Sequence, residues 1–258
     1  MDILNKDELF TLSLHLDLAD FLNFCKTSRK HEKLNNEVVW RAKIRKDFPN
    51  FKHEDLLLEL QHKSLQEIYT LLYTVKVWKL EMHVNDFYFK TNIVSFEHDI
   101  DLIPECLHLP NLKNLTLEYN KITRIPNNLN LPELRNLSLC RNKITNIPEL
   151  HFPKLHNLSL TENLIHELPN LNSDSLTTLH LHHNNITSVS EDLNLPSLRI
   201  LDLNRNKIST IPSNLNLPNL EILRLKENPI TAICKIQFPK LSQLEIGPLN
   251  SYYTLGRG

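Results

Sequence analysis

Residues 112–120 read Leu112-Lys113-Asn114-Leu115-Thr116-Leu117-Glu118-Tyr119-Asn120, and the same phrase recurs along most of the chain. Its pattern is L-x-x-L-x-L with an asparagine three residues after the last leucine. Six copies carry the asparagine, at spacings of 21 or 22 residues, and a seventh copy, Leu241, Leu244 and Ile246, lacks it. Such regularity predicts an array of stacked coils. The asparagines are Asn120, Asn142, Asn163, Asn184, Asn206 and Asn228.

The residue types in the phrase indicate how each coil folds. In L-x-L, alternation places both leucines on one side of a short strand and the x residues on the other. A single coil cannot bury its leucine face, so neighbouring coils must stack into a continuous core. We expect each asparagine, at the turn leaving the strand, to bond backbone groups inside the stack. The sequence therefore predicts a parallel sheet of at least six strands, with the leucines and asparagines pointing inward.

Between the copies, the chain follows a second pattern, I-x-x-I-P-x-x-L-x-L-P. Ile122, Ile125 and Pro126 begin one example, and Pro132 ends it. Proline fixes φ and removes a backbone donor, so this return path is predicted to be extended or a short 3₁₀ turn rather than a long helix. The phrase and its period resemble leucine-rich repeats, whose units are about 20–29 residues long. The resemblance implies a curved α/β solenoid with a concave parallel sheet.

Composition excludes some classes of partner. The formal net charge is −1, which does not favour general binding to nucleic acid or to an anionic membrane. No stretch approaches the roughly 18 apolar residues of a membrane span. The four cysteines are scattered, and no basic and then apolar leader opens the sequence. Glycans on the sequons at Asn114, Asn136 and Asn157 would obstruct the predicted sheet. These features predict an intracellular, cytoplasmic protein.

The N-terminal residues break the repeat and read as helices. Residues 1–48 predict three short ones, at about 6–14, 19–34 and 37–46, with Asn35 or Asn36 capping the third. Residues 49–91 predict a helical bridge and cap, with helices at about 54–62 and 65–82 and a strand at 87–89. Residues 92–258 then hold one degenerate copy of the repeat, six regular copies and one terminal copy. The predicted fold class is an α unit followed by an α/β solenoid.

Part of the first unit resembles a known motif. Leu4-Asn5-Lys6-Asp7-Glu8-Leu9, Leu16-Asp17-Leu18-Ala19-Asp20-Phe21-Leu22 and Val39-Trp40 are similar to the F-box pattern, with departures at Asn5, Thr27-Ser28 and His31. The segment after Trp40 resembles F-box tails of large DNA viruses, which would imply host cytoplasm. The resemblance implies a Skp-family adaptor, through it a cullin, and an SCF-type ubiquitin ligase. The adaptor-binding residues it implies are Leu4, Leu9, Phe10, Leu12, Leu16, Leu18, Phe21, Leu22, Phe24 and Trp40.

The polar x positions of the strands are predicted to bind a protein target. They form a ladder of mixed charge, which suits a specific protein better than a polyanion. Protonation of His180 and His182 near pH 6.5 is expected to strengthen binding to an acidic target. The predicted target-binding residues are Tyr119, Arg141, Glu162, His180, His182, His183, Asp202, Arg205, Arg224 and Lys226.

The sequence supports two other functions, metal binding and nucleophilic catalysis, less well than it supports protein binding. His180, His182 and His183 could share a metal ion, but no cysteine or carboxylate at a matching position completes a site. Cys25 could act as a nucleophile, but it has no clear basic activator. No catalytic residue, cofactor or metal is therefore predicted. The rival function is a leucine-rich scaffold or regulatory subunit, whose N-terminal helices merely cap the array.

Overall fold

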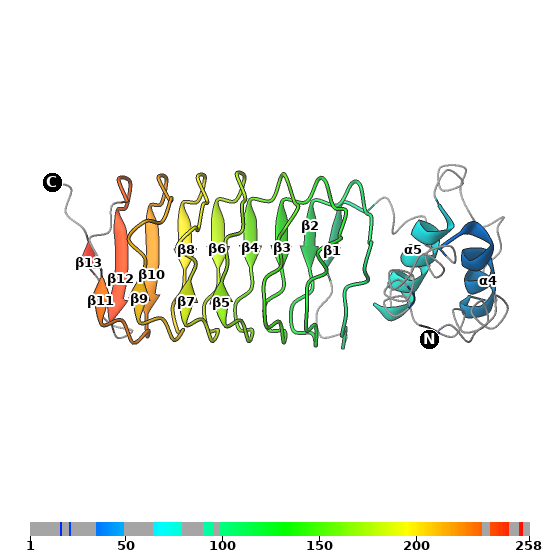
Figure 1. Cartoon of the computed structure of the whole chain (residues 1–258), viewed down its shortest axis with the longest axis horizontal. Coiled ribbons are helices and arrows are strands. Elements are labelled where there is room, and N and C mark those ends of the chain that lie inside the picture. The colour runs from blue at the N-terminus through cyan, green and yellow to red at the C-terminus, as the bar shows by residue number, and fades with distance from the viewer. Residues whose placement is uncertain are drawn as a thin grey trace, which may run out of the picture. The chain divides into compact units, whose positions relative to one another are not determined.

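The computed structural model describes residues 16, 21, 35–48, 64–78, 90–94, 99–233, 238–247 and 253–254. The chain divides into two compact units. The first comprises residues 1–89 and 104–108, and the second comprises residues 90–103 and 109–258. Helices belong to the first unit, and the strands of the repeats belong to the second (Figure 1).

The first unit contains helices α4, Glu37–Asp47, and α5, Leu65–Val77. Asn36 begins α4, because its side-chain oxygen accepts the N–H groups of Val38 and Val39. Ser64 begins α5 through a capping box with Glu67. The predicted helix at 65–82 is too long, since Trp78 forms the C-cap and ends the helical bonding there. Neither helix in the described parts of the chain has the length and apolar character needed to cross a bilayer.

Aromatic rings hold α4 and α5 together. The Trp40 ring meets Phe21 edge-on, with centroids 4.8 Å apart, and lies 5.4 Å from the ring of Tyr69 on α5. The ammonium of Lys43 is fully buried beside Phe21 and Tyr69 and donates to the carbonyl of Leu16. The Asp47 carboxylate also lies 3.7 Å from this ammonium. Together these contacts offset the solvation energy that the charge loses on burial.

Only part of the predicted helical architecture can be compared with the structure. The described residues contain two helices, and α4 covers the third helix predicted for the first unit. The helices predicted at 6–14 and 54–62, the strand at 87–89 and nearly all of 19–34 lie outside the described residues. A trihelical F-box unit is therefore not shown.

The second unit is a parallel-sheet solenoid. Its main sheet has nine strands in the order β1-β2-β3-β4-β6-β8-β10-β12-β13 (Figure 1). Neighbours pair in parallel, one coil apart, except for β12 and β13, which are antiparallel. The predicted sheet is therefore confirmed. The strands are Asn92–Val94 (β1), Asn114–Thr116 (β2), Asn136–Ser138 (β3), Asn157–Ser159 (β4), Thr178–His180 (β6), Ile200–Asp202 (β8), Ile222–Lys226 (β10), Gln243–Gly247 (β12) and Tyr253–Thr254 (β13).

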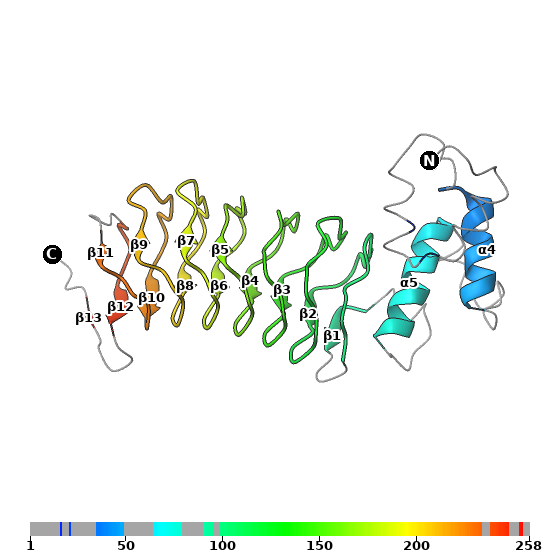
Figure 2. The ribbon, with the colours of Figure 1, turned by 60° about the horizontal axis from the view of Figure 1, so that its bottom comes forward.

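The return path is extended, as its prolines predict. Short parallel pairs form between β5 and β7 and between β9 and β11, on the side of the coils opposite the main sheet (Figure 2). No 3₁₀ turn is assigned in the described residues of the array. These strands are Glu167–Leu168 (β5), Ser188–Val189 (β7), Thr210–Ile211 (β9) and Ala232–Ile233 (β11).

Leucines and asparagines fill the space between the main sheet and the return path. Leu117, Leu139, Leu160 and Leu181 have no exposed surface. Burying each leucine stabilises the fold by about 1.5–3 kcal/mol. The asparagine of each regular copy bonds backbone groups of its own coil and of the preceding one, so the inward asparagines are confirmed. In the degenerate first copy, Ile100 and Ile103 are buried at the corresponding return-path positions.

Candidate functional site

The main sheet presents a mostly polar surface, which we call the sheet face, and its apolar positions are Val94, Ile200 and Ile222. It consists of the strand side chains that alternate with the buried leucines, and it forms rows that run across the strands. The central row is set by the strand register and reads Thr116, Ser138, Ser159, His180, Asp202, Arg224 and Glu245. Towards its C-terminal end, this row changes from hydroxyl groups to ionisable groups.

A ladder of amides borders the hydroxyl part of the sheet face. Asn114 donates to Asn92, Asn136 donates to Asn114, and Asn157 donates to Asn136, each through the side-chain amide. Sequence analysis recognised three of these residues only as sequons. The ladder could have been predicted from the sequence, because asparagine occupies the same strand position in successive copies. The ladder fixes the orientation of amide groups along four neighbouring strands.

Hydroxyl and thiol groups form a second chain beside the amide ladder. The hydroxyl of Ser138 donates to Glu118 at 2.5 Å. The Cys140 sulfur lies 3.4 Å from the Ser138 oxygen and 2.9 Å from the oxygen of Ser159. Each side chain is half-buried. This part of the sheet face is therefore a preorganised set of neutral donors and acceptors around one carboxylate.

Ion pairs dominate the other half of the sheet face. Arg224 lies between two carboxylates, 3.2 Å from Glu245 and 3.5 Å from Asp202. Glu245 also lies 3.5 Å from the ammonium of Lys226, and both of these residues are buried. Such charges are stable in the interior only when they are paired. Glu245 is not among the predicted site residues, because alternation does not predict how deeply a side chain of the terminal copy is buried.

Histidines lie where the two halves of the sheet face meet. Burial lowers the pKa of His180, Arg224 and His182 lower it further, and Asp202 opposes them. His180 is therefore neutral at physiological pH, and its protonation requires a pH below the ordinary value near 6.5. The rings of His182 and His183 lie 6.1 Å apart. No group of three or more potential metal ligands occurs within the described residues.

The residue before each inward asparagine forms a rim along the sheet face. These residues have positive φ angles of 53–57°, a region that glycine enters more readily than other residues do. Each backbone N–H donates to a carbonyl of the next coil, as Arg141 does to Thr161 at 2.9 Å. These hydrogen bonds between coils thus hold the rim residues in the left-handed conformation. The rim residues are Tyr119, Arg141, Glu162, His183, Arg205 and Glu227.

Side chains of the rim contact one another from coil to coil. The Arg141 guanidinium lies 4.6 Å from the centroid of the Tyr119 ring and 3.0 Å from Glu162. Arg205 and Glu227 form a similar pair at 2.9 Å. The structure therefore brings nine of the ten predicted target-binding residues together on one surface, in the rim and in the neighbouring rows, whereas the tenth, Lys226, is buried. Pairing among them means that a target must compete with internal partners for these charges.

The predicted adaptor-binding residues are less completely described. Phe21 and Trp40 are buried in the first unit, at 0% and 2% exposure, so their side chains serve its packing and are not available for a direct contact. Leu16 is half-buried. The remaining predicted adaptor contacts, at positions 4, 9, 10, 12, 18, 22 and 24, lie outside the described residues.

Comparisons with known proteins agree with the repeat architecture. Residues 174–217 match the family model of leucine-rich repeats in two copies. A leucine-rich-repeat protein of Leptospira interrogans is 29% identical, with a TM-score of 0.41, over 48% of this chain and 39% of that one. YopM of Yersinia enterocolitica is 20% identical, with a TM-score of 0.31, over 60% and 52%. This chain thus spans about half of those structures or less. No curated protein matches it. The C-terminal region consists of leucine-rich repeats.

Proposed function

We propose that this chain is the substrate-recognition subunit of an SCF-type ubiquitin ligase. The sheet face would hold a protein target, and the N-terminal unit would bind a Skp-family adaptor and, through it, a cullin. The proposal places the chain in the cytoplasm, or in the host cytoplasm if the chain is viral. Its task would be to raise the effective concentration of a target lysine near the ubiquitin-charged enzyme, without bond chemistry of its own.

The continuous sheet face carries the target-binding part of the proposal. Leucine-rich repeats are protein-interaction modules, and in this chain a central polar row runs from β2 to β12 across the parallel strands of the main sheet. The rim adds Tyr119, Arg141 and Arg205, and aromatic and arginine side chains are enriched among residues that dominate binding energy. A rigid scaffold with alternating donors, acceptors and charges favours one partner shape over others.

The adaptor-binding part rests on the F-box resemblance of residues 3–42. Helix α4 begins at Glu37, where the third helix of that motif is predicted, and Asn36 supplies its cap. The test is co-purification of the full chain with a purified Skp-family adaptor. We expect a stable complex, and we expect the double variant Leu9→Ala/Leu18→Ala to lose it while the array keeps its thermal transition. Failure of the unmodified chain to bind any Skp-family adaptor would reject this part alone.

A second candidate function is a leucine-rich scaffold that has no connection to ubiquitin. The burial of Phe21, Trp40 and Lys43 favours it, because these side chains form an internal core. If the Leu9→Ala/Leu18→Ala variant fails to fold, those leucines belong to that core as well, and the scaffold function gains support. Enzymatic ligation through Cys25, which lies outside the described residues, predicts a ubiquitin thioester on the isolated chain.

A further inference from the structure

A row of basic side chains lies along one edge of the main sheet. Lys113, Arg135 and His156 stand just before β2, β3 and β4, and all three are exposed. Their backbones stack coil on coil, because the N–H of Arg135 donates to the carbonyl of Lys113 at 2.8 Å and the N–H of His156 donates to the carbonyl of Arg135 at 2.9 Å. We call these three residues the basic edge. They lie outside the sheet face, whose side chains belong to the strands.

Two side chains of the basic edge carry charges that the described part of the chain does not neutralise. Within the described residues, neither the Lys113 ammonium nor the Arg135 guanidinium forms an ion pair or a hydrogen bond. The nearby carboxylate of Glu133 is bonded to Lys154. That hydrogen bond is the main cause of the lowered pKa of Glu133, and the charges of Arg135 and Lys113 lower it further. One carboxylate thus faces several cations, and the edge keeps an excess of positive charge.

Farther along the same row, Arg199 shows how this position binds a carboxylate. Its guanidinium donates through Nε and Nη2 to the two carboxylate oxygens of Glu221, each at 2.9 Å. Glu221 holds the same row position in the following coil, since its N–H donates to the carbonyl of Arg199. Other arginines of the array are also paired with carboxylates of the chain, namely Arg141, Arg205 and Arg224. The coil that follows Arg135 has His156 at the row position, so Arg135 lacks the carboxylate that Arg199 receives from its neighbour.

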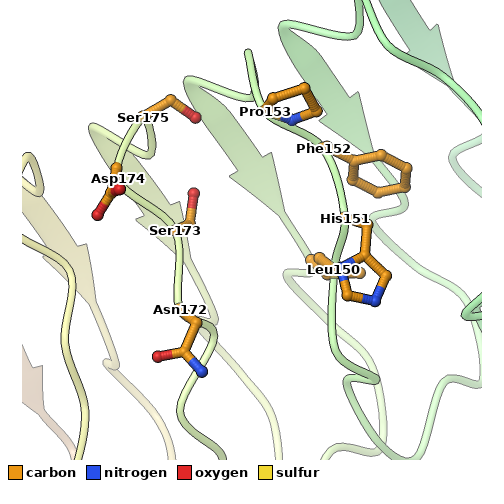
Figure 3. A pocket seen from close by; sticks show the side chains of 8 residues that line it. All are labelled: Leu150, His151, Phe152, Pro153, Asn172, Ser173, Asp174 and Ser175. Carbon is orange, nitrogen blue, oxygen red and sulfur yellow. The ribbon is translucent and has the colours of Figure 1, made fainter.

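The basic edge ends at His156. The coil that follows has Thr177 in the row and carries Ser173-Asp174 where the preceding coil has Phe152-Pro153. A pocket lies between these two segments, and the Asp174 carboxylate points away from Pro153 (Figure 3). Asp174 is exposed, and a carboxylate at the surface repels an acidic partner. The region that favours negative charge is therefore confined to the coils that carry the basic edge.

We propose that the basic edge binds an acidic helix of a partner protein. Neighbouring coils pair as strands, which lie about 4.7–4.9 Å apart. On a helix, side chains four residues apart lie about 5–6 Å from each other, whereas alternate residues of an extended chain lie about 6.4–6.8 Å apart. A helix that lies across the strands therefore presents one glutamate to each coil. One glutamate pairs with the Lys113 ammonium, and the next accepts both donors of the Arg135 guanidinium, as Glu221 does from Arg199.

The inference goes beyond the proposed function, because the basic edge lies outside the sheet face and its test requires neither target nor adaptor. The test is a titration of the isotope-labelled full chain with an alanine-based helical peptide that carries glutamates at four-residue spacing, followed by NMR. The matched control peptide carries glutamine at those positions. We expect saturable binding at about 0.01 M salt, with shifts at residues 113, 135 and 156, and its loss at about 1 M salt. The glutamine peptide should bind at least about threefold more weakly.

Three variants make the test specific. Arg135→Gln removes the guanidinium and should weaken binding of the glutamate peptide at least about threefold. Arg199→Gln is the matched control, since its guanidinium already holds Glu221, and it should leave binding unchanged. His156→Glu supplies an internal carboxylate in the register of Glu221, so it should occupy Arg135 and abolish binding. All three positions are exposed, so the thermal transition should stay nearly unchanged.

The proposal is overturned if the glutamine peptide binds as well as the glutamate peptide, if Arg135→Gln binds as the unmodified chain does, or if Arg199→Gln loses binding equally. Binding of the glutamate peptide by the folded His156→Glu variant would also contradict it. A single-stranded oligothymidylate of the same net charge tests for nucleic acid. Tighter binding of this oligonucleotide than of the peptide would overturn the proposal, because the occupant would then be a phosphate backbone.

Discussion

The side-chain oxygen of Asn142 accepts a hydrogen bond of 3.0 Å from the backbone N–H of Ile122, on the preceding coil. Its amide nitrogen donates to the carbonyls of Leu117 and Leu139. Asn142 therefore satisfies buried backbone groups of two coils. Its replacement by alanine leaves them unpaired, so we expect a loss of about 1–3 kcal/mol in the free energy of unfolding. Urea denaturation measures this loss in the free energy of unfolding, and Asn127→Ala, at an exposed position, is the control. Equal stability of both variants would contradict this role.

Buried and exposed ion pairs should differ in their contribution to stability. Glu245 is buried and contacts both Arg224 and Lys226, so Glu245→Ala leaves cations without their carboxylate. We expect a loss of about 1.5–3 kcal/mol. The matched control is Glu221→Ala, which breaks the exposed pair with Arg199 and should cause a much smaller loss. Urea denaturation of both variants decides this, and a larger loss for Glu221→Ala would show that burial does not govern these pairs.

The array could be predicted from the sequence because every coil buries its leucines in the same way. Leu117 and Asn120 are inward for the same reason as their equivalents in later coils, so the periodicity predicts the sheet, its order and its core. The end of α5 at Val77 was less predictable. Helical spacing continues to Leu80, but capping contacts rather than periodicity decide where a helix ends.

The depressed pKa of His180 predicts that stability falls in acid. Burial, Arg224 and His182 keep this imidazole neutral in the folded chain, whereas in the unfolded chain it titrates near 6.5. Below about pH 6.5, the unfolded chain therefore binds more protons at this position than the folded chain does. The stabilising contribution is complete above that pH and is lost as the pH falls towards the lowered pKa.

The variant His180→Gln should therefore lose less stability on acidification than the unmodified chain does. Thermal denaturation between about pH 5 and 8 measures this, and His166→Gln, at an exposed position, is the control. If the unmodified chain and both variants lost stability in parallel, the acid sensitivity would not come from His180. The lowered pKa also corrects the expectation that His180 gains charge near pH 6.5 to favour an acidic target.

The candidate site could be predicted only in outline. Alternation placed Arg141 and His180 on the polar face, but it could not reveal their partners, because contacts across coils depend on side-chain conformation. The positive φ of Tyr119 and the pairing of Arg141 with Glu162 appear only in three dimensions. The pocket near Ser173 was also missed, although a comparison of the copies shows the departure from Leu-Pro.

The most direct test of the central claim is site-specific photo-crosslinking of the full chain in cell lysate. A photoreactive phenylalanine analogue replaces Tyr119 on the rim or, as the control, Asn127 on the return path. The account predicts a discrete protein adduct from position 119 that disappears when Arg141 and Arg205 are changed to alanine, and no such adduct from position 127. An adduct from position 127 with none from position 119 would contradict the claim that the sheet face holds the target.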